Sequence, residues 1–283
     1  MAEQVEGSTA APRRQPPVQH ILTVQSTQWL SPHLVRVVLT GESLAEFTDN
    51  GSTDAYVKLM FVDPALGLEP PYDLAELRQT LRPEQLPVTR TYTVRWVDRA
   101  ARRLAIDFVV HGDSGIAAPW AAHTSAGDRL VLAGPGGGYA PDPSAAWHVF
   151  AGDLSALPAI AAAIETLPSA ARGVAHLEVG DNEDILDLEN RSQVQVSWLL
   201  NADPSDTGFL ARAVDDASWP ARTSGDGVQV FAHGERESIK AVRAVLAKRG
   251  IGRESVSISG YWARGRTEEV FQAEKREPIG KIG

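Results

Sequence analysis

The 283-residue sequence contains no cysteine. This absence excludes disulfide bonds, zinc sites with thiolate ligands and iron–sulfur clusters held by cysteine. If the protein transfers electrons, it therefore needs a different carrier. An excess of basic residues is also lacking, because 27 lysines and arginines face 36 aspartates and glutamates. Without a basic stripe, a nucleic-acid partner is not expected.

Long apolar runs are missing as well. No stretch approaches the roughly 18 consecutive apolar residues that a membrane-spanning helix needs, so no membrane segment is expected. Residues 1–17 are polar, and no apolar stretch follows Arg13 and Arg14 as an export signal would require. We therefore expect a disordered leader at residues 1–17 and a cytoplasmic protein. The length of the chain favours two domains.

The first half of the chain is predicted to be β-structure. Short segments with alternating apolar and polar residues, separated by Gly, Pro and Asp turns, are typical of antiparallel strands. The predicted strands are His20–Gln25, His33–Thr40, Tyr56–Val62, Thr89–Val97, Arg103–Val110 and Asp128–Ala133. Six such strands favour a small antiparallel Greek-key barrel. Residues 63–87 form a proline-rich insertion with one helical turn expected at Leu74–Gln79.

In the second half, strands and helices alternate, which predicts a parallel sheet with helices on both faces. The predicted strands are Trp147–Ala151, Val174–Val179, Val194–Leu199, Val228–His233 and Ser255–Gly260, and the predicted helices are Ser155–Leu167, Thr207–Asp216 and Glu235–Arg249. The glycine-rich stretch Gly134–Pro143 lacks the Lys-Ser/Thr of a phosphate loop, so a connector is the better interpretation. We expect domains at residues 18–140 and 141–283, with a ligand crevice at the carboxyl ends of the parallel strands.

The segment Arg90-Thr91-Tyr92-Thr93 carries the first candidate site. On a strand, Arg90 and Tyr92 share one face while Thr91 and Thr93 share the other. An arginine fork beside an aromatic ring suits a ligand with a phosphate and a planar ring system. The alternative is an exposed sheet face with one extended arginine.

A second candidate follows the strand Arg103–Val110. His111 and a glycine turn lead into small residues, and Pro119 lies where the first helical turn is expected. A helix that begins with small side chains presents free backbone N–H groups, and these suit a pyrophosphate.

Together the two motifs resemble the siderophore-interacting protein family, whose members are flavin-dependent ferric-siderophore reductases with a ferredoxin-reductase-like fold. The family's Arg-x-Tyr-Ser/Thr is matched by Arg90, Tyr92 and Thr93. Its second motif is matched at His111, Gly112, Gly115, Ala117, Trp120 and Ala121, whereas Ile116 replaces a proline and Ala118 a serine. The resemblance implies FAD bound by Arg90, Thr91, Tyr92, Thr93, Asp107, Val109, His111, Gly115, Ala117, Ala118 and Trp120.

The second half resembles the same family at three strand ends. Gly152-Asp153-Leu154-Ser155-Ala156 matches the family's Gly-Asp-Glu-Thr-Ala, with Leu154 in place of an acid and Ser155 in place of a threonine. The resemblance implies that NADPH or NADH is bound near Asp153, Ser155, Ala156 and Glu235, and that Trp262 caps the flavin ring or lines a substrate pocket.

Each of these residues also has a structural interpretation. Ser155 suits a helix N-cap as well as a phosphate contact. Glu235 could stabilise the start of the following helix, and Trp262 could pack between the domains. The acidic run Glu178–Asp184 is either a ribose-binding edge that repels a 2′-phosphate or a solvated loop.

The resemblance implies reduction of a ferric siderophore with electrons from NAD(P)H, passed through FAD. Lys58, Arg264 and Arg266 are the candidate cations for an anionic siderophore. No catalytic acid or base and no protein metal ligand is expected, because the flavin supplies the chemistry. Three alternatives remain open: a carrier without redox turnover, a general flavin reductase, and an enzyme that receives electrons from an external ferredoxin.

Overall fold

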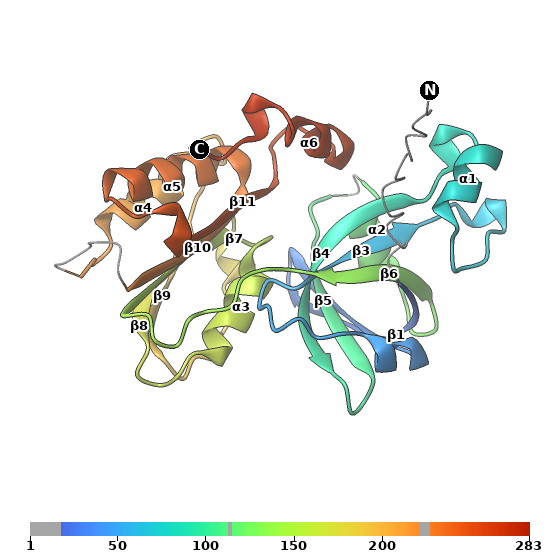
Figure 1. Ribbon diagram of the computed structural model, residues 1–283, viewed down its shortest axis with the longest axis horizontal. Helices are drawn as coiled ribbons and strands as arrows, with labels where there is room; N and C mark the ends of the chain where they lie inside the picture. Colours follow the sequence, from blue (N-terminus) through green and yellow to red (C-terminus); the bar gives the residue numbers. More distant parts are fainter. Residues whose placement is uncertain (1–17, 113–114, 221–226) are drawn as a thin grey trace, which may run out of the picture.

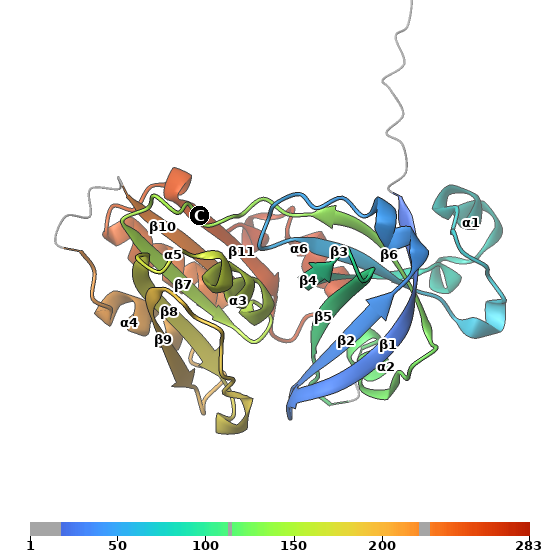
Figure 2. The ribbon, with the colours of Figure 1, turned by 90° about the horizontal axis from the view of Figure 1, so that it is seen from below.

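The computed structural model describes residues 18–112, 115–220 and 227–283, and the predicted leader lies outside these ranges. The described chain forms a barrel and an α/β unit that lie side by side (Figures 1 and 2). None of its described helices is long and apolar enough to cross a membrane.

The barrel contains the six predicted strands. They are β1 Gln19–Ser31, β2 Leu34–Thr40, β3 Tyr56–Phe61, β4 Val88–Asp98, β5 Arg103–Val109 and β6 Arg129–Gly136. Their order around the closed barrel is β1-β2-β5-β4-β3-β6, with every neighbouring pair antiparallel. Alternate side chains fill the interior, among them Leu22, Val37, Leu59 and Leu104. The prediction of a six-stranded antiparallel barrel is confirmed.

Short helices lie in the connections between the barrel strands. They are α1 Leu74–Thr80, α2 Ala117–His123, and the 3-10 turns η1 Glu42–Glu46, η2 Pro64–Leu66 and η3 Pro83–Gln85. α1 lies where the sequence predicts a helical turn. Asp73 caps this helix, because its carboxylate accepts hydrogen bonds from the N–H groups of Ala75 and Glu76.

The second unit is a five-stranded parallel sheet in the order β11-β10-β7-β8-β9. Its strands are β7 Trp147–Asp153, β8 Arg172–Val179, β9 Gln193–Leu200, β10 Val228–Glu235 and β11 Val256–Trp262. Its helices are α3 Leu157–Thr166, α4 Phe209–Asp216, α5 Arg236–Lys248 and α6 Glu268–Glu274, with 3-10 turns η4 Asn182–Asp184, η5 Arg253–Ser255 and η6 Pro278–Gly280. α3 packs on one face of the sheet, and α4 and α5 pack on the other. The predicted parallel sheet with helices on both faces is confirmed.

Two local predictions need correction. The start of the glycine-rich stretch belongs to β6, because Gly136 pairs with Tyr56 of β3, so the connector begins later than predicted. Ser155 does not cap α3: the N-cap residue is Ala156, and the Ser155 hydroxyl instead donates to Asp153. The domain division at residue 140 stays a prediction, and it falls between the end of β6 and the start of β7.

Polar contacts join the two units at separate places. Arg95 of β4 donates to Glu165 of α3, with Nη1 2.9 Å from Oε2. Asp184, which is 1% exposed, accepts a hydrogen bond from Ser31 Oγ at 2.6 Å, and His33 Nδ1 lies 2.8 Å from its other oxygen. These contacts fix the barrel against the sheet on two sides of the seam.

Candidate functional site

The face of β4 that carries Arg90 and Tyr92 points toward the barrel interior. Arg90 pairs with Leu59 and Tyr92 pairs with Val57, and both β3 partners are fully buried in the barrel core. Residues directly opposite each other on antiparallel strands share a face. Thr93 lies on the other face and is 8% exposed. The predicted division of faces is therefore observed.

Arg90 is held at one nitrogen and free along one edge. Nη1 donates to the Thr89 carbonyl at 3.0 Å and lies 2.7 Å from Glu269 Oε1 on α6. Within the described residues, Nε and Nη2 have no hydrogen-bond partner, and the side chain is 16% exposed. Two parallel N–H groups on one edge are the geometry that grips two oxygens of a phosphate.

Tyr92 belongs to an aromatic cluster. Its ring lies 4.4 Å from that of Phe108, and Trp120 lies 5.7 Å from both Phe108 and Phe61. Burial raises the pKa of Tyr92 to about 12, and the Arg90 charge opposes that rise only in part. Tyr92 therefore stays a neutral phenol that can donate a hydrogen bond at physiological pH.

The second motif places two glycines ahead of α2. Gly112 and Gly115 have φ values of 62° and 85°, which favour glycine, and no atom of the described residues lies within 4 Å of where a Cβ would project at either. Ala117 and Ala118 lie in the first turn of α2, where N–H groups lack an intrahelical partner. The exposed His111 precedes the turn. Unfilled space beside small residues fits the diphosphate of FAD.

Two predicted FAD residues point elsewhere. Asp107 accepts two hydrogen bonds from Arg36, at 2.6 and 2.7 Å, and Val109 packs into the core around α3. Val109 thus faces the second unit and the Asp107 carboxylate is occupied by Arg36 of β2, which leaves their backbone as the part available to a cofactor. The alternation of residues along β5 does not predict the contact between Asp107 and Arg36, because Arg36 lies on a different strand.

The second candidate site is organised around Asp153 at the carboxyl end of β7. Its Oδ2 accepts hydrogen bonds from the Trp262 indole and from the Glu235 N–H, both at 2.8 Å. Its Oδ1 accepts from the Ser155 N–H at 2.9 Å and from the Ser155 hydroxyl. Ala156 follows and is fully buried. The four residues predicted for the nucleotide and Trp262 therefore meet at one edge of the sheet.

Glu235 acts as a helix cap. Its Oε2 accepts hydrogen bonds from the N–H groups of Glu237 and Ser238, at 2.7 and 3.0 Å. Its Oε1 accepts from the Arg264 N–H at 3.1 Å, and the residue is 4% exposed. The structural interpretation of Glu235 is thus observed, while a contact with the nicotinamide stays a prediction. Trp262 differs, since 37% of it is exposed.

Some acidic residues at the ends of β8 and β9 form hydrogen bonds within the protein. Glu178 accepts a hydrogen bond from Asn201 at 2.9 Å, and burial raises the pKa of Glu178. Asp184 is not part of a solvated loop, because it is buried against the β1–β2 hairpin. Its partners lie about 150 residues earlier in the chain, so the sequence pattern carries no signal for this contact.

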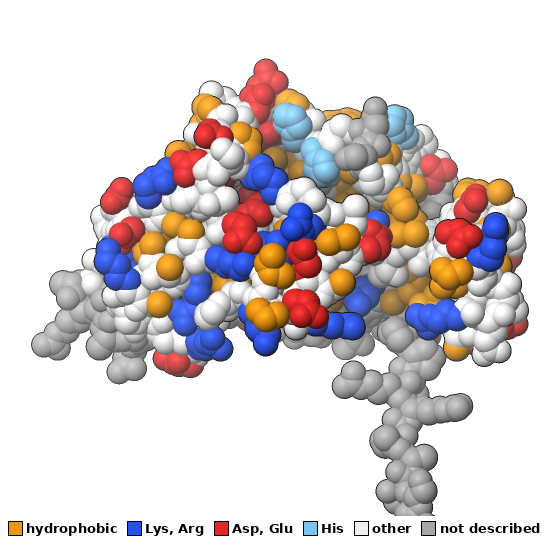
Figure 3. All heavy atoms as spheres, turned by 90° about the horizontal axis from the view of Figure 1, so that it is seen from above, with side chains coloured by type: hydrophobic (Ala, Val, Ile, Leu, Met, Phe, Trp, Pro, Cys, Tyr) orange, Lys and Arg blue, Asp and Glu red, His pale blue; other side chains and the backbone are white. Residues whose placement is uncertain are grey.

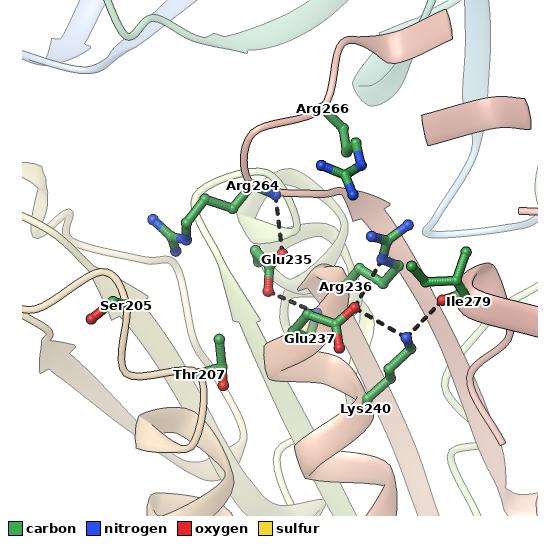
Figure 4. A pocket seen from close by; sticks show the side chains of 9 residues that line it. All are labelled: Ser205, Thr207, Glu235, Arg236, Glu237, Lys240, Arg264, Arg266 and Ile279. Atoms are coloured by element: carbon green, nitrogen blue, oxygen red, sulfur yellow. Dashed lines mark hydrogen bonds and ion pairs between the residues drawn. The ribbon is translucent and has the colours of Figure 1, made fainter. Parts of the chain in front are cut away.

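The predicted substrate cations do not all meet. Arg264 and Arg266 line a pocket of about 460 Å³ (Figure 4), whereas Lys58 is exposed on β3 of the barrel. The pocket is lined by Ser205, Thr207, Glu235, Arg236, Glu237, Lys240, Arg264, Arg266 and Ile279. Arg236 and Lys240 are cations that the sequence argument missed, since a helix of mixed charge gave no reason to select them.

Most cations in this pocket already have a carboxylate partner. Arg266 Nε lies 2.7 Å from Glu274, and Arg236 and Lys240 each lie 3.0 Å from Glu237. Arg264 has no ion pair among the described residues, and its side chain extends toward Ser205, away from Arg266 (Figure 4). On the face seen in Figure 3, basic and acidic side chains are likewise interspersed. Arg264 is therefore the pocket's most available cation.

Comparison with known proteins agrees with this geometry. Residues 23–139 match the siderophore-interacting FAD-binding domain, and residues 145–265 match the siderophore-interacting protein family. An uncharacterised protein of Mycobacterium tuberculosis is 42% identical over 91% of this chain and 95% of its own. The ferric vibriobactin reductase ViuB of Vibrio cholerae is 38% identical over 88% of this chain and 90% of its own.

Solved structures give the same result. The siderophore-interacting protein SipS of Aeromonas hydrophila superimposes with a TM-score of 0.79 at 30% identity, covering 94% of this chain and 99% of SipS. The ferredoxin reductase of a carbazole 1,9a-dioxygenase, at 16% identity and a TM-score of 0.61, shares the fold. With its FAD-binding barrel and its second domain both matched, the chain belongs to the siderophore-interacting protein family.

Proposed function

We propose that this protein reduces ferric siderophores, using FAD on the barrel and electrons from a nicotinamide dinucleotide bound at the Asp153 edge of the sheet. Two named relatives support the activity: the ferric vibriobactin reductase of Vibrio cholerae, and an NADPH-dependent ferric-chelate reductase of Escherichia coli that is 29% identical over 85% of this chain. The observation that carries the proposal is the free Nε/Nη2 edge of Arg90 beside the Tyr92 ring.

Residues of the barrel hold and orient the cofactor. Arg90 and the N–H groups of Ala117 and Ala118 bind the diphosphate, while Tyr92 borders the ring system. Bound FAD supplies the conversion of a two-electron hydride into single electrons. The protein itself therefore needs no acid or base for the electron step, and its task is to orient the partners and exclude water.

Residues at the sheet edge receive the dinucleotide. Asp153 fixes Trp262 at the end of β11, and the first turn of α3 follows immediately. The acidic strand ends, including Glu178 and Asp203, disfavour an added 2′-phosphate. Hydrogen bonds from Ser205 lower the pKa of Asp203, and the charge of Arg264 lowers it further, so Arg264 lies close enough to offset part of the negative charge. Comparing kcat/KM for NADH and NADPH decides which of these charges dominates.

Cations without a carboxylate partner receive the substrate. The overall charge of −9 repels an anionic ferric siderophore, so local positive charge is needed for docking. Arg264 and Lys58 supply it, because neither has an ion pair among the described residues. The iron(III) chelate is the substrate and needs no protein ligand.

An anaerobic absorbance experiment tests the proposal. Purified protein is loaded with FAD, then mixed with NADPH or NADH, and finally with a ferric siderophore. Bleaching of the flavin band by a nucleotide and its return with the iron chelate is the expected result. Flavin that binds but does not bleach would point to another electron donor or to a carrier. Failure to bind FAD would refute the assignment of Arg90 and Tyr92.

A further inference from the structure

A segment beyond the matched part of the chain contacts the candidate flavin site. The family match ends at residue 265, and α6 follows it at Glu268–Glu274. In both ribbon views α6 lies between β11 and the barrel (Figures 1 and 2). Its Glu269 places Oε1 2.7 Å from Arg90 Nη1. A carboxylate from the C-terminal helix therefore touches the arginine expected to bind the FAD diphosphate.

The helix that carries Glu269 is fixed to the second domain. Glu274 binds both Arg236, at 2.5 Å, and Arg266, at 2.7 Å. Phe271 is 1% exposed. Further along, Lys240 Nζ donates to the Ile279 carbonyl at 2.6 Å. These contacts hold α6 on the sheet side of the seam, so Glu269 reaches the barrel from a fixed base.

The contact leaves the phosphate-binding edge of Arg90 free. Nη1 is shared between the Thr89 carbonyl and Glu269, and both acceptors lie on the same nitrogen. A guanidinium held at one nitrogen cannot turn freely about its side-chain bonds. Its remaining edge, Nε and Nη2, then keeps the orientation that a bidentate phosphate contact requires.

Two opposing effects of Glu269 on an anionic ligand can be weighed. Its charge repels a phosphate, but 62% of its side chain is exposed, so water screens that repulsion. The Arg90 side chain is only 16% exposed, and the 2.7 Å ion pair with Glu269 holds Nη1 at close range, where screening is weakest. Orientation therefore outweighs repulsion.

We propose that Glu269 is a positioning residue for flavin binding, which holds Arg90 so that its free edge meets the FAD diphosphate. Because α6 is anchored to the second domain, the grip on the flavin depends on both domains. This inference rests on the proposed function, since it requires that Arg90 binds FAD.

Titration of the apoprotein with FAD, followed by flavin fluorescence, tests the inference without turnover. Glu269→Ala should weaken FAD affinity about two- to fivefold, as expected for loss of an exposed ion pair. Glu269→Gln should restore most of that loss, because its amide oxygen still accepts from Arg90. Glu277→Ala, in the same segment but without an ion pair in the described chain, should leave affinity unchanged.

The Arg90→Ala background separates the positioning role of Glu269 from the proposed function of Arg90 in FAD binding. There, Glu269→Ala should have no further effect on FAD affinity, because the group that it orients is gone. If Arg90→Ala weakens FAD binding but Glu269→Ala leaves it unchanged or tightens it, the positioning role is refuted while the proposed function stands. If Arg90→Ala itself leaves affinity unchanged, both are refuted.

Discussion

Replacing Asp153 should impair nucleotide use while leaving FAD binding intact. In Asp153→Ala, the Glu235 N–H loses its only acceptor in the described structure, and Glu235 is 4% exposed. An unpaired buried N–H costs about 1–3 kcal/mol in the free energy of unfolding. Trp262 also loses the acceptor of its indole N–H. Since small displacements at a reacting site are costly, we expect flavin reduction by the nucleotide to slow about ten- to hundredfold.

Asp153→Asn provides the matched control. Its remaining oxygen can face Trp262 and Glu235, while its NH₂ group faces the Ser155 hydroxyl, which can turn to accept. Only the Ser155 N–H then loses its acceptor, so the expected loss in the free energy of unfolding is about 0.5–1.5 kcal/mol.

The assays are urea unfolding, FAD titration and anaerobic stopped-flow bleaching of the flavin band. FAD affinity should be unchanged in both variants, because Asp153 contacts Ser155, Glu235 and Trp262 but neither Arg90 nor Glu269. Bleaching at the wild-type rate in Asp153→Ala would refute the role of the Asp153 edge. Equal destabilisation by Ala and Asn would refute the hydrogen-bond argument.

Three further predictions concern other parts of the molecule. Asp184→Ala should lower the free energy of unfolding by about 2–4 kcal/mol, because buried hydrogen bonds across the seam are lost; a change below about 0.5 kcal/mol in urea unfolding would contradict this. Burial lowers the pKa of His233 from 6.5 to about 3, so below pH 6.5 only the unfolded chain gains this proton. As the pH falls below 6.5, the free energy of unfolding should then decrease by about 1.4 kcal/mol per pH unit. In His233→Gln this decrease should be shallower between about pH 6.5 and pH 5. Arg264→Ala should slow reoxidation of the flavin by anionic ferric chelates about threefold or more at low salt, an effect that salt removes; the exposed Arg253→Ala should have no such effect.

Periodicity and strand ends made much of the site predictable. Alternation on β4 separates Arg90 and Tyr92 from the threonines, and the buried partners on β3 agree with that division. Ligands bind at the carboxyl ends of parallel strands, and this rule alone predicts that Asp153 and Trp262 lie at the same edge of the sheet. These are consequences of local geometry and topology, which the sequence pattern reports directly.

Contacts between distant segments were not predictable in the same way. Glu269 lies in a C-terminal segment for which the sequence pattern predicts no helix or strand, and its partner is 179 residues earlier. Ser155 has the chemistry of an N-cap, yet its hydroxyl is used by Asp153 instead. In each case a polar side chain had several feasible partners, and the tertiary structure decided among them.

The polar contacts across the seam bear on how such a protein would work. They come from three elements of the second domain, namely α3, η4 and α6, and they reach β4 and the β1–β2 hairpin of the barrel. Opening the domains would break all three at once, including the buried Asp184. By contrast, Trp262 is partly exposed, and its ring is held by one indole hydrogen bond to the Asp153 carboxylate, worth about 1.5–3 kcal/mol, and by the Arg264 guanidinium 5.5 Å from the ring centroid. We therefore expect movement of this one ring to be the least costly way to admit a nicotinamide, because it leaves the three contacts across the seam in place.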